Sequence, residues 1–162
     1  GQDHEHENHG DDVLDHGAIL AVGVPATLLS GRDATRTAYA RAMERSLVVK
    51  VTCGADQPEK LSQALTVAAT AVASGVTVSL WLTGDAVQLA VPGGVPDLGL
   101  AHAVPLADLV AAVLAGGTTT VCTQCAARRG LSSDDLARGV RIAGAATFVE
   151  ESLADGAQAL VY

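Results

Sequence analysis

The chain has 162 residues, 49% of them hydrophobic, which is enough for one sizeable buried core, so we expect one folded domain. Aromatic residues make up only 2%, and a core filled with Ala, Val and Leu favours closely packed α/β layers over a large aromatic-lined pocket. The formal net charge of −8 argues against binding to nucleic acid and to anionic membrane surfaces.

The cysteine count and the apolar stretches indicate the cellular setting. Three cysteines form no disulfide framework, which favours a reducing, cytoplasmic environment. The longest apolar stretches, such as residues 64–82, are interrupted by Ser, Thr and Gly, so we expect no membrane span. The chain opens with acids and histidines rather than with a basic and apolar segment, so we also expect no secretory signal.

Residues 1–45 differ in composition from the rest of the chain. The first sixteen residues hold six acids and four histidines but no Lys or Arg, which is typical of a disordered, solvated tail. We expect no functional metal site there, because a flexible segment would first have to become ordered. Met43 stands just before the first convincing strand. We therefore hypothesise that residues 1–42 are a nonessential extension whose deletion leaves a folded, thiol-reactive protein.

Strands and helices alternate from Leu47 onward. Residues 47–53 predict a buried strand, and residues 58–74 predict a helix with Pro near its first turn and Gly just past its end. Residues 76–82 predict a second strand, so this unit implies a parallel pair with a right-handed crossover. A short helical piece over residues 85–91 then leads into a turn-rich loop.

The second half of the chain continues the alternation. A helix is expected over residues 105–115, and the β-branched run 118–121 predicts a strand that leads into Cys122. The remaining expected elements are a short helix capped by Ser132 or Ser133, a strand at 140–142, a helix at 145–154 and a closing strand at 158–162. Residues 46–162 therefore predict a single three-layer α/β domain with a mainly parallel sheet of about five strands and flavodoxin-like layering.

The candidate active site is the junction that holds Cys122 and Cys125. Both thiols follow a strand and lie at a helix start, where free backbone N–H groups and the positive end of the helix dipole stabilise a thiolate. Arg128 and Arg129 add positive charge about one turn further on, which favours a thiol with a depressed pKa. The alternative for each cysteine is inert packing in the core.

Other chemistries have less support in the sequence. The two close cysteines could form half of a zinc site, but Cys53 and His102 supply no second close-spaced ligand pair, so we expect no metal. A phosphate loop, a dinucleotide fingerprint and a Ser-His-Asp order are all missing from the sequence, so we expect no bound cofactor.

Four residues are candidates for supporting roles. Cys53 closes the first strand, so its thiol is expected on the same edge of the sheet as Cys122, although strand order decides whether the two can meet. His102 could accept a proton from Cys122 or orient a substrate, or it could simply pack or face solvent. Arg128 and Arg129 could stabilise charge or dock a donor, or be exposed helix charges.

A set of short motifs, in order along the chain, resembles one family. The motifs are Lys50-Val51-Thr52-Cys53-Gly54 with Asp56-Gln57-Pro58, Gly75-Val76-Thr77-Val78 before Trp81-Leu82-Thr83, Val121-Cys122 before Arg129-Gly130-Leu131, and Leu160-Val161-Tyr162. Together they resemble the DsrE-type sulfur-relay proteins of the DsrE/DsrF-like family. The resemblance covers about residues 46–162.

This resemblance implies a compact α/β fold with a mainly parallel sheet, a homo-oligomer, and transfer of sulfur as a cysteine persulfide. In the relay members the accepting cysteine stands eight residues before the glycine of an Arg-Gly turn, and Cys122 stands eight residues before Gly130. The implied partners are sulfur-donor and sulfur-acceptor proteins or small thiols. Cys125 is not part of the relay pattern, so this chain could use Cys122 and Cys125 together as a dithiol instead of Cys122 alone as a carrier.

Three functional hypotheses follow. In the first, a sulfurtransferase or sulfur carrier accepts sulfane sulfur on Cys122 and passes it to an acceptor. In the second, a thiol redox protein or sensor cycles a Cys122–Cys125 disulfide. In the third, the chain is a noncatalytic oligomeric binding module.

Overall fold

The computed structural model describes residues 45–162. The predictions for the acidic tail and the nonessential extension concern residues before this range and lie outside the described residues. Within residues 45–162, no helix combines the length and the apolar character that a membrane span needs.

A five-stranded, entirely parallel sheet forms the centre of the domain. Its strands are β1 (Ser46–Val51), β2 (Thr77–Leu82), β3 (Thr118–Cys122), β4 (Arg141–Ala143) and β5 (Ala157–Val161). They lie in the order β4-β3-β2-β1-β5. The predicted α/β class and parallel sheet are thus confirmed. The order places β3 two strands away from β1, with β2 between them.

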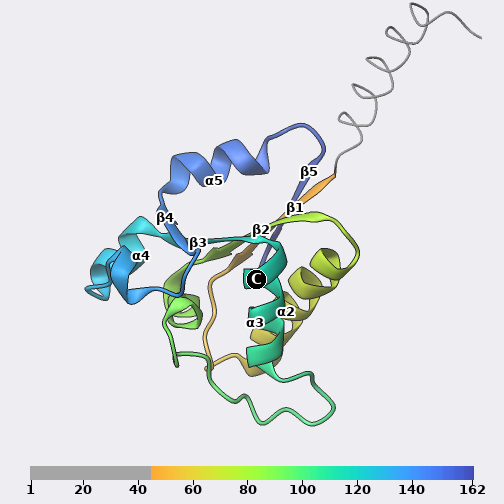
Figure 1. Cartoon of the computed structure of the whole chain (residues 1–162), viewed down its shortest axis with the longest axis vertical. Coiled ribbons are helices and arrows are strands. Elements are labelled where there is room, and N and C mark those ends of the chain that lie inside the picture. Colours follow the sequence, from red (N-terminus) through yellow and green to blue (C-terminus); the bar gives the residue numbers. More distant parts are fainter. Residues whose placement is uncertain (1–44) are drawn as a thin grey trace, which may run out of the picture. The chain divides into compact units, whose positions relative to one another are not determined.

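Helices cover the two faces of the sheet unequally. The helices α2 (Pro58–Ala73) and α3 (Leu106–Gly116) pack against each other on one face, while α5 (Ala145–Ser152) lies on the opposite face (Figure 1). Strands β1 to β4 follow one another in one direction across the sheet, whereas β5 is added at the opposite edge, beside β1. The right-handed connection from β4 to β5 therefore places α5 on the other face.

The alternation of side chains along each strand separates a dry core from a more polar face. Val49 and Val51 of β1 and Leu80 of β2 belong to the main apolar cluster, with α2 and α3. The intervening residues Lys50 and Trp81 line a cavity with Phe148 of α5, so they face the other way. The α5 face of the sheet therefore contains a cavity in which a ligand could bind.

Turn and cap residues end the elements close to where the sequence predicts. Pro58 begins α2, and Gly75 follows it with φ +77, a left-handed conformation that glycine adopts without strain. The helical piece after β2 is a 3-10 helix, η2 (Gly84–Ala90). The short helix after the cysteines is also 3-10, η3 (Ser133–Asp135), and Ser132 and Asp135 form a reciprocal capping box.

Candidate functional site

Cys122 and Cys125 lie at the junction between β3 and the short helix α4 (Thr123–Arg128). Cys122 is the last residue of β3 and the N-cap of α4, and it is half-buried. Cys125 is on the first turn of α4 and is buried, with 8% exposure. Both are free thiols. The strand-to-helix junction expected from the sequence is thus present, with one accessible and one covered thiol.

The surroundings of Cys122 favour its thiolate. Partial burial opposes ionisation of the thiol, but hydrogen bonds from the backbone N–H groups of Cys125 and Gln124, a hydrogen bond from the Cys125 thiol and the charge of Lys50 outweigh that effect. The pKa of Cys122 is therefore held below its ordinary value. A thiolate is the nucleophilic form of cysteine, so this side chain is suited to attack on sulfur.

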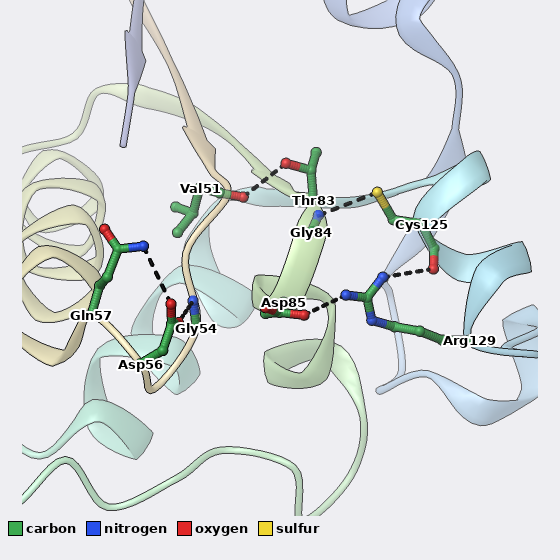
Figure 2. Close-up of polar contacts among 9 residues, drawn as sticks. All are labelled: Val51, Gly54, Asp56, Gln57, Thr83, Gly84, Asp85, Cys125 and Arg129. Carbon is green, nitrogen blue, oxygen red and sulfur yellow. Dashed lines mark hydrogen bonds and ion pairs between the residues drawn. The ribbon is translucent and has the colours of Figure 1, made fainter.

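Cys125 is fixed from the side of β2 and η2. The N–H of Gly84 donates to the Cys125 Sγ over 3.2 Å, and the guanidinium of Arg129 donates to the Cys125 carbonyl oxygen over 3.3 Å (Figure 2). The hydroxyl of Thr83, beside Gly84, donates to the Val51 carbonyl over 3.1 Å. The second thiol is thus anchored to the ends of β1 and β2.

A cavity of about 310 Å³ opens beside Cys122. Trp81 and Phe148 line it with ring centroids 5.4 Å apart at 76°, an edge-to-face pair. Lys50 also lines it, with Nζ 4.6 Å from the centre of the Phe148 ring. The low aromatic content argued against a large aromatic-lined pocket, and this cavity is small, yet two of the few aromatic side chains form its wall.

Sequence reasoning did not assign Lys50, Trp81 or Phe148 to the site. A signal was present in the period of two along β1 and β2, because Lys50 and Trp81 alternate with the aliphatic residues of the core face and so fall on the opposite face. They are direct partners in the strand register. The position of Phe148 over this face depends on where α5 crosses the sheet, which local sequence patterns do not specify.

A polar network holds α5 on the sheet above the cavity. Glu151 of α5 accepts hydrogen bonds from the Ser79 hydroxyl over 2.6 Å and from the Trp81 indole N–H over 2.8 Å, and it pairs with Arg141. Arg141 also donates to the Thr120 hydroxyl over 2.8 Å. Burial opposes ionisation of Glu151, but these hydrogen bonds outweigh it and lower the pKa of the carboxyl group.

The two arginines after the cysteines have different surroundings. Arg129 forms an ion pair with Asp85 of η2, with 2.5 Å between Nη2 and Oδ1 (Figure 2). Arg128 is exposed. Neither side chain is among those that line the cavity beside Cys122. Arg129 thus braces α4 against η2, a contact that the sequence did not indicate.

Cys53 and His102 are not brought to Cys122. Cys53 belongs to the apolar cluster between the sheet and α2, where burial raises the pKa of its thiol. Because β2 lies between β1 and β3, the backbones of β1 and β3 are about 9.5 Å apart. In addition, Cys122 lies on the α5 face of the sheet, whereas Cys53 lies on the face covered by α2. A disulfide between Cys53 and Cys122 is out of reach. His102 is exposed in the loop before α3, has φ +62, and does not line this cavity.

Residues 45–162 contain no group of three or more His, Cys, Asp or Glu side chains arranged to hold a metal ion. The chemistry that the described site can support is that of a nucleophilic thiolate with a second thiol beside it. Lys50 adds a positive charge and the aromatic pair adds an apolar wall.

Comparisons with known proteins identify a family. The model of the DsrE/DsrF-like family matches residues 45–161. No curated protein matches the chain. Among solved structures, the chain is similar to the ychN protein from E. coli, with a TM-score of 0.59, 23% sequence identity, and coverage of 73% of this chain and 99% of that chain. This structural likeness concerns the fold.

Proposed function

The chain belongs to the DsrE/DsrF-like family, and from this premise we propose that it is a sulfur-relay protein that carries sulfane sulfur as a persulfide on Cys122. The observation that carries the proposal is the half-buried Cys122 thiol, whose pKa is lowered and which lines a cavity. A relay thiol needs a favoured thiolate form and access for its donor; the lowered pKa of Cys122 supports the first, and its position in the lining of the cavity supports the second.

The transfer takes place in two balanced exchanges. The Cys122 thiolate attacks the outer sulfur of a donor persulfide, the donor's sulfur–sulfur bond breaks, and the donor leaves as a thiolate that takes up a proton. An acceptor thiolate then attacks the outer sulfur of the Cys122 persulfide, and Cys122 leaves as a thiolate. Neither exchange needs an external oxidant or reductant. Donor and acceptor are proteins or small thiols.

Cys125 supports a second candidate function, thiol redox chemistry. Its thiol donates a hydrogen bond to Cys122 and its sulfur is anchored by the Gly84 N–H. The Cys125 thiolate would attack the inner sulfur of the Cys122 persulfide, form a Cys122–Cys125 disulfide and release hydrosulfide. A dithiol reductant would then have to return two electrons to the pair. A redox sensor would cycle the same disulfide without bound sulfur.

Exposed apolar side chains on α5 and β5 support the proposed homo-oligomer. Val149 of α5 is 51% exposed, Leu153 at the C-cap of α5 is 79% exposed, and Val161 of β5 is 64% exposed. Burying these side chains against a second copy removes apolar surface from water. Sedimentation velocity of the full chain tests this part of the proposal, and a monomer at all concentrations would contradict it.

The test of function is mass analysis of the two cysteines after incubation with a sulfane-sulfur donor. The segment between Lys60 and Arg128 contains no Lys or Arg, so one tryptic peptide holds Cys122 and Cys125 and leaves out Cys53. After alkylation, we expect this peptide to gain one sulfur atom on Cys122, and reductant should reverse the gain. Loss of two hydrogens without added sulfur favours the redox function, and an unchanged mass favours the binding module.

Two serine variants separate the candidate functions further. Cys122→Ser should abolish the gain of sulfur. Cys125→Ser should preserve it if Cys122 is a carrier, because the relay needs only one thiol. If the redox function is correct, Cys125→Ser should instead abolish reversible oxidation of the pair.

A further inference from the structure

The cavity beside Cys122 is larger than transfer of a single sulfur atom requires. Its volume of about 310 Å³ is roughly ten times the share of liquid volume that one water molecule occupies. It lies at the lower end of the range for pockets that hold small organic molecules. Room therefore remains for the organic part of a donor after its sulfane sulfur has reached Cys122.

The wall of the cavity suits a short apolar chain. Trp81 and Phe148 present their edge-to-face rings to it, and Gly144 and Ala145 add little bulk at the start of α5. The Trp81 N–H is already used by Glu151, so this ring offers the cavity mainly apolar surface. The polar residues Thr83, Thr123 and Gln124 also line the cavity, and the Thr83 hydroxyl already donates to the Val51 carbonyl.

Lys50 gives the cavity a positive charge that lacks a carboxylate partner within the described chain. The only ion pairs among residues 45–162 are Arg129–Asp85 and Arg141–Glu151. Nζ of Lys50 instead lies over the Phe148 ring, at 4.6 Å. Glu151, which lies on the same face of the sheet, is occupied by Ser79, Trp81 and Arg141. An anionic group that enters the cavity therefore meets an ammonium that it can neutralise.

We propose that this cavity admits a low-molecular-weight organic persulfide bearing a carboxylate, whose short chain contacts Trp81 and Phe148 and whose carboxylate pairs with Lys50. This inference rests on the proposed acceptance of sulfur by Cys122 and names the class of donor. The Cys122 thiolate attacks the outer sulfur of the donor, the donor's sulfur–sulfur bond breaks, and the organic thiolate leaves with the electron pair and takes up a proton. Lys50 is thus a specificity-determining residue.

The test compares two donors that differ only in charge, the persulfides of mercaptopropionate and of its neutral isostere mercaptopropionamide. The rate of sulfur gain on Cys122 is measured for the full chain, for Lys50→Gln and for Lys50→Arg. We expect the wild type to prefer the acid by about tenfold, the effect of one charge-assisted hydrogen bond. Lys50→Gln should lose this preference, and Lys50→Arg should keep it and so show that the position tolerates substitution.

Lys60→Gln is the matched control, because Lys60 is the other lysine of the chain and does not line this cavity. It should retain the preference for the acid. Equal wild-type rates for the two donors would overturn the inference and leave the proposed function standing. If Lys50→Gln slowed sulfur gain on Cys122 equally with both donors, the inference would also be overturned, because Lys50 would then act only on the Cys122 thiolate and not on the donor's carboxylate. If neither donor loads Cys122, the proposed function is overturned as well.

Discussion

The N–H of Gly84 donates a hydrogen bond to the Sγ of Cys125 over 3.2 Å, and this contact joins the start of η2 to the helix that carries the second thiol. Gly84 has φ +54, and a Cβ at this position would lie 2.5 Å from the Thr52 carbonyl oxygen. A side chain there would clash with the backbone of Thr52, just after β1, and would also be strained by the left-handed conformation. The placement of Cys125 thus depends on a glycine outside the cysteine motif.

Gly84→Ala should therefore destabilise the domain more than an ordinary glycine substitution. We expect a loss of about 2–3 kcal/mol in the free energy of unfolding, measured with urea, because left-handed strain and a backbone clash add together. Gly75→Ala is the control, since Gly75 has φ +77 but no atom within 4 Å of the added Cβ. It should cost only about 1–2 kcal/mol. Equal losses in both variants would contradict the clash with Thr52.

Cys125→Ala should raise the pKa of Cys122. The variant removes the thiol that donates a hydrogen bond to the Cys122 sulfur, whereas the backbone donors remain. The rate of alkylation of Cys122, followed as a function of pH, should therefore rise at higher pH than in the wild type, with slower reaction at neutral pH. Cys53→Ala should leave this profile unchanged, because Cys53 lies on the other face of the sheet. An unshifted profile in Cys125→Ala would argue that the backbone donors alone stabilise the thiolate.

Most of the fold could be predicted from local patterns. The β-branched run at Thr118–Val121 and the Pro58 and Gly75 boundaries of α2 act through nearest-neighbour sterics, so the sequence contains the information directly. Strand order is different, because it depends on which strands bury the most surface together. The separation of Cys53 from Cys122 by β2 therefore emerged only from the structure.

The site was predictable in its chemistry but not in its surroundings. The spacing of Cys122 and Cys125 across a strand-to-helix junction is local, and the structure has that junction. The two adjacent arginines look equivalent in sequence, yet within residues 45–162 only Arg129 forms an ion pair, with Asp85 in an element about forty residues away. Lys50 likewise becomes part of the site only because α5 brings Phe148 over β1 and β2.

Arg129→Ala should reduce stability, whereas Arg128→Ala should not. Arg129 pairs with Asp85 and donates to the Cys125 carbonyl, so its loss frees α4 from η2. Asp85 is largely exposed, and solvent screening limits the expected cost to about 1 kcal/mol. Arg128→Ala should stay within about 0.5 kcal/mol of the wild type in the same urea titration. A larger effect of Arg128 than of Arg129 would be inconsistent with the bracing role of Arg129.

The Glu151 network should make stability depend on pH. The pKa of Glu151 in the folded protein lies below its ordinary value of 4.5, because hydrogen bonds from Ser79, Trp81 and Arg141 outweigh the effect of burial. Its carboxylate therefore stabilises the fold above pH 4.5, and this contribution is lost as the pH falls through the folded-state pKa. Urea titrations across the acidic range should show a decline in stability that is smaller in Glu151→Gln.

The neighbouring Glu150 provides the control for this prediction, because it is exposed on the same helix and does not take part in the network. Glu150→Gln should keep the acid-dependent decline of the wild type, while Glu151→Gln should already be less stable at neutral pH by about 1–2 kcal/mol. Since α5 carries Phe148, Glu151→Gln should also loosen the wall of the cavity and lower the fluorescence anisotropy of Trp81. The same pH dependence in both variants would show that α5 is held by apolar contacts rather than by Glu151.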